Sequence, residues 1–171
     1  MIDVNDFRPA IVYVIYIASR PEKVWQALTS AEFSRQYFSG LAVELEQRRG
    51  GAFAVRQPDG SLHISGEVIE CDPPRRLTIT WNVNWPALIE KLGPTLVSYE
   101  IEPAGDAVRL TLIQSHDRPI SDDILSGGRA GWPAILSGMK TLLETGAALA
   151  IKMEPPQRML AALKELGIGT P

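Results

Sequence analysis

Few side chains in this sequence are of the types that carry out acid–base chemistry. The 171 residues include two histidines, His63 and His116, and His116 is followed by Asp117. A histidine beside a carboxylate could act as a base with an orienting acid. Adjacent residues of a strand point to opposite faces, however, and these two residues end a predicted strand. We therefore interpret them as two solvated polar side chains rather than as a catalytic pair.

The sequence also offers little for a metal, a nucleotide or a covalent intermediate. Transition-metal sites need three or four ligands, and the one cysteine, Cys71, has no histidine at ligand spacing. Asp122 and Asp123 could bind a cation, but we expect them to stabilise the start of the helical turn that follows them. No phosphate-binding loop, dinucleotide fingerprint or Gly-x-Ser-x-Gly motif is present. We predict no catalytic residue, no metal site and no cofactor.

A set of apolar residues with one polar member is the better candidate for function. Its members fall on faces of predicted strands and of a predicted helix that point inward: Phe53, Trp81, Tyr99, Leu112, Gln114, Trp132, Leu136 and Met139. Gln114 follows Leu110 and Leu112 at alternate positions, so its amide lies on an apolar face and needs hydrogen-bond partners. A ligand or a bound water could supply them. Plain core packing uses the same residue types, so both interpretations stay open.

Hydrophobic periodicity indicates the elements that position this set. Residues 9–18 form a β-branched run and predict a strand. Two short helices are expected between this strand and Gly40. Ser19 is predicted to cap the first of them, with Glu22 at the spacing of a capping box.

Short alternating segments separated by turn residues continue to residue 115, and they predict an antiparallel sheet of about six to seven strands. Within this part, residues 83–94 form a longer segment that holds one or two helical turns. Residues 131–150 then carry apolar residues at positions i, i+3, i+4 and i+7, which predicts one long helix.

The end of the chain carries a second amphipathic pattern, formed by Met159, Leu160, Leu163 and Leu166. We expect one domain over residues 1–150 and an amphipathic tail helix within residues 151–171. This tail helix either docks on the domain or pairs with another chain.

The composition is that of an ordinary globular protein, with 45% hydrophobic residues, 22% charged residues and a net charge of −3. No run of lysine and arginine is present, which argues against a nucleic-acid partner. No apolar run approaches the roughly 20 residues that span a bilayer, so no membrane contact is expected. A single cysteine permits no internal disulfide and is typical of a cytoplasmic protein.

Several segments carry a resemblance to a known family. They are residues 17–29, 66–77, 80–81, 108–112 and 131–136. Their order and spacing resemble the helix-grip fold of the SRPBCC superfamily, which includes START domains and the birch-pollen allergen. Within that superfamily the chain is similar to the bacterial family of activator-of-heat-shock-chaperone-ATPase homologue-like proteins, over about residues 10–150.

This resemblance implies an α+β fold in which a curved antiparallel sheet wraps around one long C-terminal helix. It also implies a cavity between sheet and helix that takes apolar or aromatic ligands. The family label implies a chaperone partner and a role in the stress response. Members often carry a histidine at the position of Gln114, whereas this chain has His116 two residues further on.

Three functions follow, in order of preference. The first is a cytoplasmic protein that binds an apolar or aromatic small molecule, with residues 83–94 and 117–130 controlling access to the cavity. The second is a protein-interaction module, either a homodimer or a chaperone cofactor, that uses an exposed sheet face, the loops or the tail helix, of which the tail helix has the best sequence support. The third is an enzyme of the cyclase or hydrolase kind, which would need His63, His116 or an acid in the cavity with a perturbed pKa. We predict a binding protein rather than an enzyme.

Overall fold

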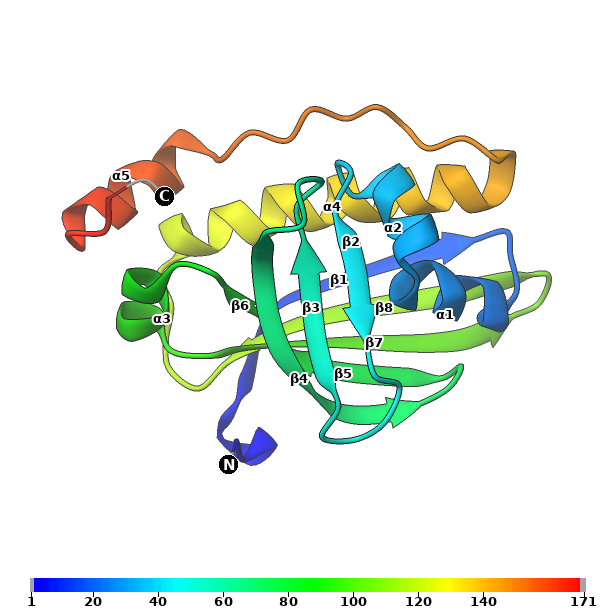
Figure 1. The fold of residues 1–171 in the computed structure, drawn as a ribbon, viewed down its shortest axis with the longest axis horizontal. Coiled ribbons are helices and arrows are strands. Elements are labelled where there is room, and N and C mark those ends of the chain that lie inside the picture. The colour runs from blue at the N-terminus through cyan, green and yellow to red at the C-terminus, as the bar shows by residue number, and fades with distance from the viewer. Residues whose placement is uncertain (1, 170–171) are drawn as a thin grey trace.

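Alternating apolar residues build a curved sheet of eight antiparallel strands in the computed structural model, which describes residues 2–169 (Figure 1). The strands are β1 (Arg8–Ile17), β2 (Ala42–Leu45), β3 (Ala52–Arg56), β4 (Leu62–Asp72), β5 (Arg76–Thr80), β6 (Asn82–Val83), β7 (Thr95–Ala104) and β8 (Ala107–His116). Their spatial order is β1-β8-β7-β5-β4-β3-β2, and β6 pairs with β4. The two-residue β6 is the one strand beyond the predicted six to seven.

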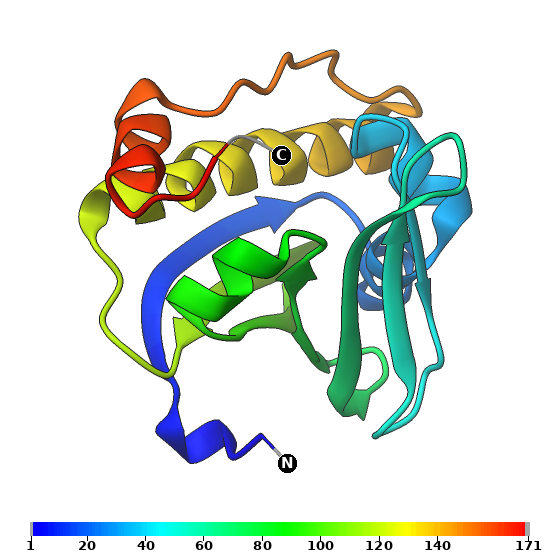
Figure 2. The same ribbon diagram turned by 60° about the vertical axis from the view of Figure 1, so that its left-hand side comes forward.

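Helices cover the open side of this sheet. They are α1 (Pro21–Thr29), α2 (Ala31–Tyr37), α3 (Pro86–Leu92), α4 (Asp122–Thr145) and α5 (Gln157–Glu165), with a short 3-10 turn at Val4–Asp6. The long helix α4 runs along the open side of the curled sheet, and the segment after it crosses the side of α4 that faces away from the sheet (Figures 1 and 2). The predicted helix-grip fold is confirmed, as is a helix within residues 83–94.

The curl of the sheet depends on a glycine in the middle of β4. The half of β4 from Val68 to Asp72 pairs with β5, whereas Ile64 and Ser65 pair with β6. A Cβ atom at Gly66 would overlap the backbone oxygen of Thr80. A glycine inside a strand marks such a close backbone approach. It allows β3 and β4 to turn away from β5 and to wrap around α4.

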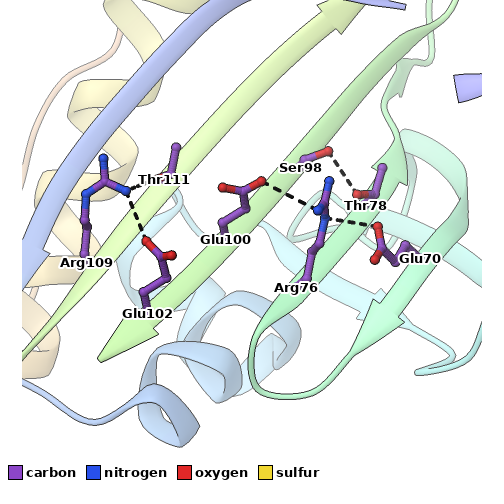
Figure 3. Close-up of polar contacts among 8 residues, drawn as sticks. All are labelled: Glu70, Arg76, Thr78, Ser98, Glu100, Glu102, Arg109 and Thr111. Atoms are coloured by element: carbon purple, nitrogen blue, oxygen red, sulfur yellow. Dashed lines mark hydrogen bonds and ion pairs between the residues drawn. The ribbon is translucent and has the colours of Figure 1, made fainter. Parts of the chain in front are cut away.

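The two faces of the sheet differ sharply in polarity. On the outer face Arg76 forms ion pairs with Glu70 at 3.0 Å and with Glu100 at 3.8 Å, and Arg109 pairs with Glu102 at 3.1 Å (Figure 3). These charges are partly exposed, so each pair contributes only about 0–1 kcal/mol. Their value lies in orientation, because a charged outer face leaves the apolar face of each strand to pack against the helices.

The predicted cap of the first helix is wrong. α1 begins at Pro21, and the N-cap is Arg20, whose side chain makes no capping bond. Proline is favoured at the first helical position because it has no N–H to leave unpaired, so the cap falls directly before it. Ser19 and Glu22 are therefore out of register for a capping box. α2 ends at Tyr37, and Gly40 lies in the turn that follows.

The predicted start of the long helix is also wrong. α4 runs from Asp122 to Thr145 rather than over 131–150, and Ser121 caps it by accepting a hydrogen bond from the Ile124 N–H at 3.3 Å. The prediction failed because three glycines and a proline within residues 127–133 disfavour a helix interior. Residues 122–130 are therefore helical, and the predicted access loop over 117–130 shrinks to residues 117–121.

The tail packs on its own domain. α5 lies against the first half of α4, with Leu163 buried and the Arg158 guanidinium 2.8 Å from the Asp123 carboxylate. Ile168 is also buried. Of the predicted tail 151–171, the last two residues lie outside the described part. Of the predicted apolar stripe, Leu163 is buried and Met159 and Leu160 are half-buried, whereas Leu166 stays 43% exposed. Docking therefore weakens the support for a partner at this helix.

Candidate functional site

A cavity of about 760 Å³ opens between α4, α3, the adjacent ends of the central strands and the tail. Helix α3 contributes apolar side chains such as Leu88 and Leu92, and α4 contributes Ile124. The tail closes another side with Met153 and Met159. α3 has no buried residue of its own, so it lies over the cavity as a cover rather than as part of the core.

Three of the eight residues predicted for the site line this cavity: Trp81, Gln114 and Trp132. Trp81 lies where the cavity meets the core, because its ring centroid is 5.1 Å from that of Trp132 and 5.7 Å from that of Phe53. The Trp132 ring meets it edge-on at 63°. Such contacts hold aromatic rings in a defined arrangement. Trp81 therefore separates a filled core from an open cavity.

The other five predicted residues lie deeper. Phe53, Tyr99 and Leu136 surround, together with Trp81 and Trp132, a space of only about 20 Å³. That volume is enough for roughly one water molecule. Leu112 and Met139 are fully buried and line neither space. The middle of the space between the sheet and α4 is thus filled by packed side chains. The larger cavity lies to one side of it, towards α3 and the tail.

A chain of hydrogen bonds crosses the cavity wall. The Trp132 indole N–H donates to Gln114 Oε1 at 2.8 Å, and Gln114 Nε2 lies 2.9 Å from His116 Nε2. An indole nitrogen is a donor only, which fixes the orientation of the Gln114 amide. Gln114 Nε2 must then donate to His116 Nε2. The partners that the sequence required for Gln114 are side chains of this protein.

The same chain fixes the state of His116. Because its Nε2 accepts, the ring is neutral and carries its proton on Nδ1. His116 is only 6% exposed, so its predicted solvation is wrong. Burial lowers the pKa of His116, and the neighbouring Asp117 carboxylate partly opposes that shift. Asp117 itself pairs with Arg118 at 2.7 Å, so it does not orient the imidazole as a catalytic acid would.

His63 lines the same cavity from β4. Its Nδ1 lies 3.2 Å from Gln57 Nε2, and burial lowers the pKa of this imidazole too. The cavity wall also includes one carboxylate, Glu154, whose exposed side chain pairs with Lys152 at 2.5 Å. Within residues 2–169, no three His, Cys, Asp or Glu side chains come together as a metal site would require.

Two glycines of α4 make room for the groups on either side of it. A Cβ atom at Gly128 would lie 2.9 Å from Gln114 Oε1, and one at Gly127 would overlap the Met159 sulfur. A Cβ at Gly131 would meet nothing within 4 Å.

Sequence reasoning missed the tail as a cavity wall. The adjacent glycines within an amphipathic stretch were the available signal, because helix interiors disfavour glycine unless close packing requires it.

Comparisons with known proteins support the fold. The sequence matches the family model for activator of Hsp90 ATPase homolog 1-like protein over residues 18–144. No curated protein matched the sequence directly. No helix among residues 2–169 has the length and apolar character needed to cross a membrane.

Solved structures with the same fold come from several bacteria. The protein MLL2253 from Mesorhizobium loti is 25% identical with a TM-score of 0.61, and the match covers 78% of this chain and 96% of that one. The solution structure of CalU16 from Micromonospora echinospora is 23% identical with a TM-score of 0.63, covering 91% and 81% of the two chains. The Aha1 dimer from Colwellia psychrerythraea is 20% identical with a TM-score of 0.64, covering 80% and 96%.

Proposed function

The chain belongs to the family of activator of Hsp90 ATPase homolog 1-like proteins, and from that premise we propose that it binds an apolar or aromatic small molecule in the 760 Å³ cavity. The observation that carries this proposal is the size of the cavity together with its mainly apolar lining. Ligand-binding cavities are commonly about 300–1,000 Å³, mostly apolar, with a few placed polar groups. Gln114, His63 and His116 are such groups here.

The proposed contacts differ in depth. Trp81 and Trp132 would form the aromatic wall that a ligand touches, and Gln114 would fix the position of Trp132. Phe53, Tyr99 and Leu136 support that wall from behind. Leu112 and Met139 belong to the packed core, so their contribution would be rigidity rather than contact.

Filling the cavity tests this proposal. Gly131 lines the cavity and a Cβ atom there would meet nothing within 4 Å, so Gly131→Leu adds bulk at the cavity wall, and Gly131→Ala is its matched control. We expect 1-anilinonaphthalene-8-sulfonate to fluoresce strongly with the native protein and with Gly131→Ala, and to lose most of that signal with Gly131→Leu. An unchanged titration for Gly131→Leu, with its melting temperature preserved, would contradict binding in this cavity.

The same geometry favours binding over catalysis. A neutral imidazole has one basic nitrogen, and in His116 that nitrogen already accepts from Gln114 at 2.9 Å. It can take a proton from a substrate only after this bond breaks. Asp117 is held by Arg118, so it gives no support to an imidazolium. His116 is thus suited to position a ligand rather than to act as a free base.

A second candidate function is self-association through the outer face of β1. Val12, Val14 and Tyr16 alternate along this edge strand and are 59%, 37% and 56% exposed. Exposed apolar side chains in a row mark an interaction surface. We propose a second copy of the chain as the occupant, because the structurally similar Aha1 from Colwellia psychrerythraea is described as a dimer. Sedimentation velocity should show a dimer that Val12→Lys dissociates, and a monomer at all concentrations would contradict this candidate.

A further inference from the structure

The segment that connects α4 to α5, residues 148–155, is held in place by few bonds, and we call it the strap. It crosses α4 as an extended thread (Figures 1 and 2). No backbone–backbone hydrogen bond within residues 2–169 involves the strap. Among the described residues, its side chains form one ion pair, which joins Lys152 to Glu154 inside the strap itself. Local opening costs least where backbone hydrogen bonds and buried apolar contacts are few.

The apolar side chains of the strap are largely in contact with water. Leu149, Ile151 and Met153 are 48%, 40% and 37% exposed. A segment without backbone hydrogen bonds depends on the burial of apolar surface for its stability. These three side chains therefore contribute little to holding the strap in its position.

Unfilled space lies on two sides of the strap. On one side is the 760 Å³ cavity. On the other side is a second hollow of about 140 Å³ between the strap, α2 and α4, which Gln36 of α2 lines. Ala134 of α4 and the strap residues Ile151 and Met153 line both spaces, so they form the partition between them. A strap with space on both sides loses few packing contacts when it moves.

Both ends of the strap are fixed. Before it, the Gly146 N–H donates to the Leu142 carbonyl oxygen at 2.8 Å and closes α4. After it, α5 is docked through the buried Leu163 and through Arg158, which lies 2.8 Å from the Asp123 carboxylate. The strap can therefore move while α5 stays on α4.

The other cover of the cavity, α3, is held more firmly. Its backbone is helical, and the Gly93 N–H donates to the Ile89 carbonyl oxygen at 2.8 Å. A Cβ atom at Gly93 would lie 2.6 Å from the Arg118 guanidinium, so this side chain packs directly against the end of α3. Opening of α3 breaks such contacts, whereas opening of the strap breaks no backbone hydrogen bond.

We infer that the strap is the gate of the cavity: it lifts from α4 to admit a ligand and closes over the ligand afterwards. This role rests on the proposed binding function and adds the route by which a ligand enters. Ile151 and Met153 line the cavity only while the strap is closed, so a bound ligand that touches them favours the closed position.

Trypsin compares the two covers in the native protein, because each holds one cleavable residue. Lys152 lies in the strap and Lys91 lies in α3, and neither is followed by proline. In the free protein we expect cleavage after Lys152 to be about tenfold faster than after Lys91, as one or two backbone hydrogen bonds allow. Saturating 1-anilinonaphthalene-8-sulfonate should slow cleavage after Lys152 several-fold and change cleavage after Lys91 less. Mass spectrometry of the fragments measures both rates.

A reversible lock tests the movement itself. Ala134→Cys with Met153→Cys places one thiol on α4 and one on the strap, in a Cys71→Ser background that leaves no other thiol. Stopped-flow fluorescence with 1-anilinonaphthalene-8-sulfonate gives the association and dissociation rates of the oxidised and the reduced form. We expect the disulfide to slow both rates by about tenfold or more and reduction to restore them, because a lid that must open limits both steps. Met153→Cys alone, under the same oxidant, is the matched control.

The outcomes distinguish the gate from the function on which it rests. If the dye protects Lys91 rather than Lys152, or if Lys91 is cleaved faster in the free protein, the strap is not the gate and the binding function stands. Equal rates in the locked and the reduced form overturn the gate as well. If the native protein does not bind the dye, the gate and the binding function are both overturned. The trypsin comparison decides in the native protein even if the disulfide does not form.

Discussion

The Trp132 indole N–H donates to Gln114 Oε1 across 2.8 Å, and this bond joins α4 to β8. It therefore links the long helix to the strand that pairs with the edge strand β1. The bond also sets the state of His116, because it fixes which end of the Gln114 amide faces the imidazole. One contact therefore couples the packing of the long helix to the chemistry of the cavity wall.

Gln114→Leu should destabilise the protein by about 1–3 kcal/mol, because it leaves the buried Trp132 N–H without an acceptor. Urea unfolding of the native chain and the variant measures this loss. In a Trp132→Phe background the same substitution should be less damaging, since the donor is already absent. Strictly additive free energies for the double variant would show that the bond contributes nothing.

Stability should fall as the pH drops below about 6.5, the ordinary pKa of histidine. Burial lowers the pKa of His116 in the folded chain, so the unfolded chain binds more protons. The stabilisation is complete above about pH 6.5 and is lost as the pH falls through the lowered folded value. Thermal unfolding between pH 7.5 and 5 measures the slope.

His116→Gln should flatten that slope without abolishing it, because burial also lowers the pKa of His63. His63→Gln is the matched comparison, and the double variant should show little dependence on pH in this window. An unchanged slope in His116→Gln would mean that the imidazole is not held neutral by its surroundings.

Gly127→Ala should loosen the packing of the tail on α4, because its methyl group would overlap the Met159 sulfur and force that side chain to move. Limited proteolysis should then cleave residues 146–156 faster, and amide exchange should rise in α5. Gly131→Ala, with open space around it, should instead stabilise the helix by up to about 1 kcal/mol. Equal behaviour of the two variants would show that the tail does not depend on this contact.

Gly66→Ala should be among the most damaging single substitutions, costing more than about 3 kcal/mol, because the new methyl group would meet the Thr80 backbone oxygen. Ser65→Ala, one residue earlier in β4, should cost less than about 1 kcal/mol. Chemical unfolding compares the two. A mild effect of Gly66→Ala would show that β4 can straighten without loss of the fold.

The strands were predictable from sequence because each has a clear apolar face. Residues such as Val97, Tyr99 and Ile101 alternate with polar neighbours, and all three are buried. Alternation of this kind depends on local order along the chain, so it needs no knowledge of distant contacts. The helix at Pro86–Leu92 was likewise indicated by its proline and its apolar spacing.

The site was harder to predict because its features are tertiary. Whether Phe53 and Leu136 meet each other or meet a ligand depends on how closely α4 approaches the sheet, which their spacing does not reveal. The burial of His116 follows from its position in the cavity wall at the end of β8, where a strand pattern alone predicts exposure. The two adjacent glycines in the first half of α4 likewise reflect tertiary contacts, because Met159 packs beside Gly127 and Gln114 beside Gly128.

The tail follows the part of the chain that matches the family, residues 18–144, and yet it forms part of the cavity wall. One C-terminal segment therefore shapes the cavity without contributing a strand to the sheet. For protein engineering, exchange of residues 151–163 would change one wall of the cavity while every strand of the sheet stays the same. A dye attached to the segment would likewise report whether the cavity is filled by the small molecule that we propose.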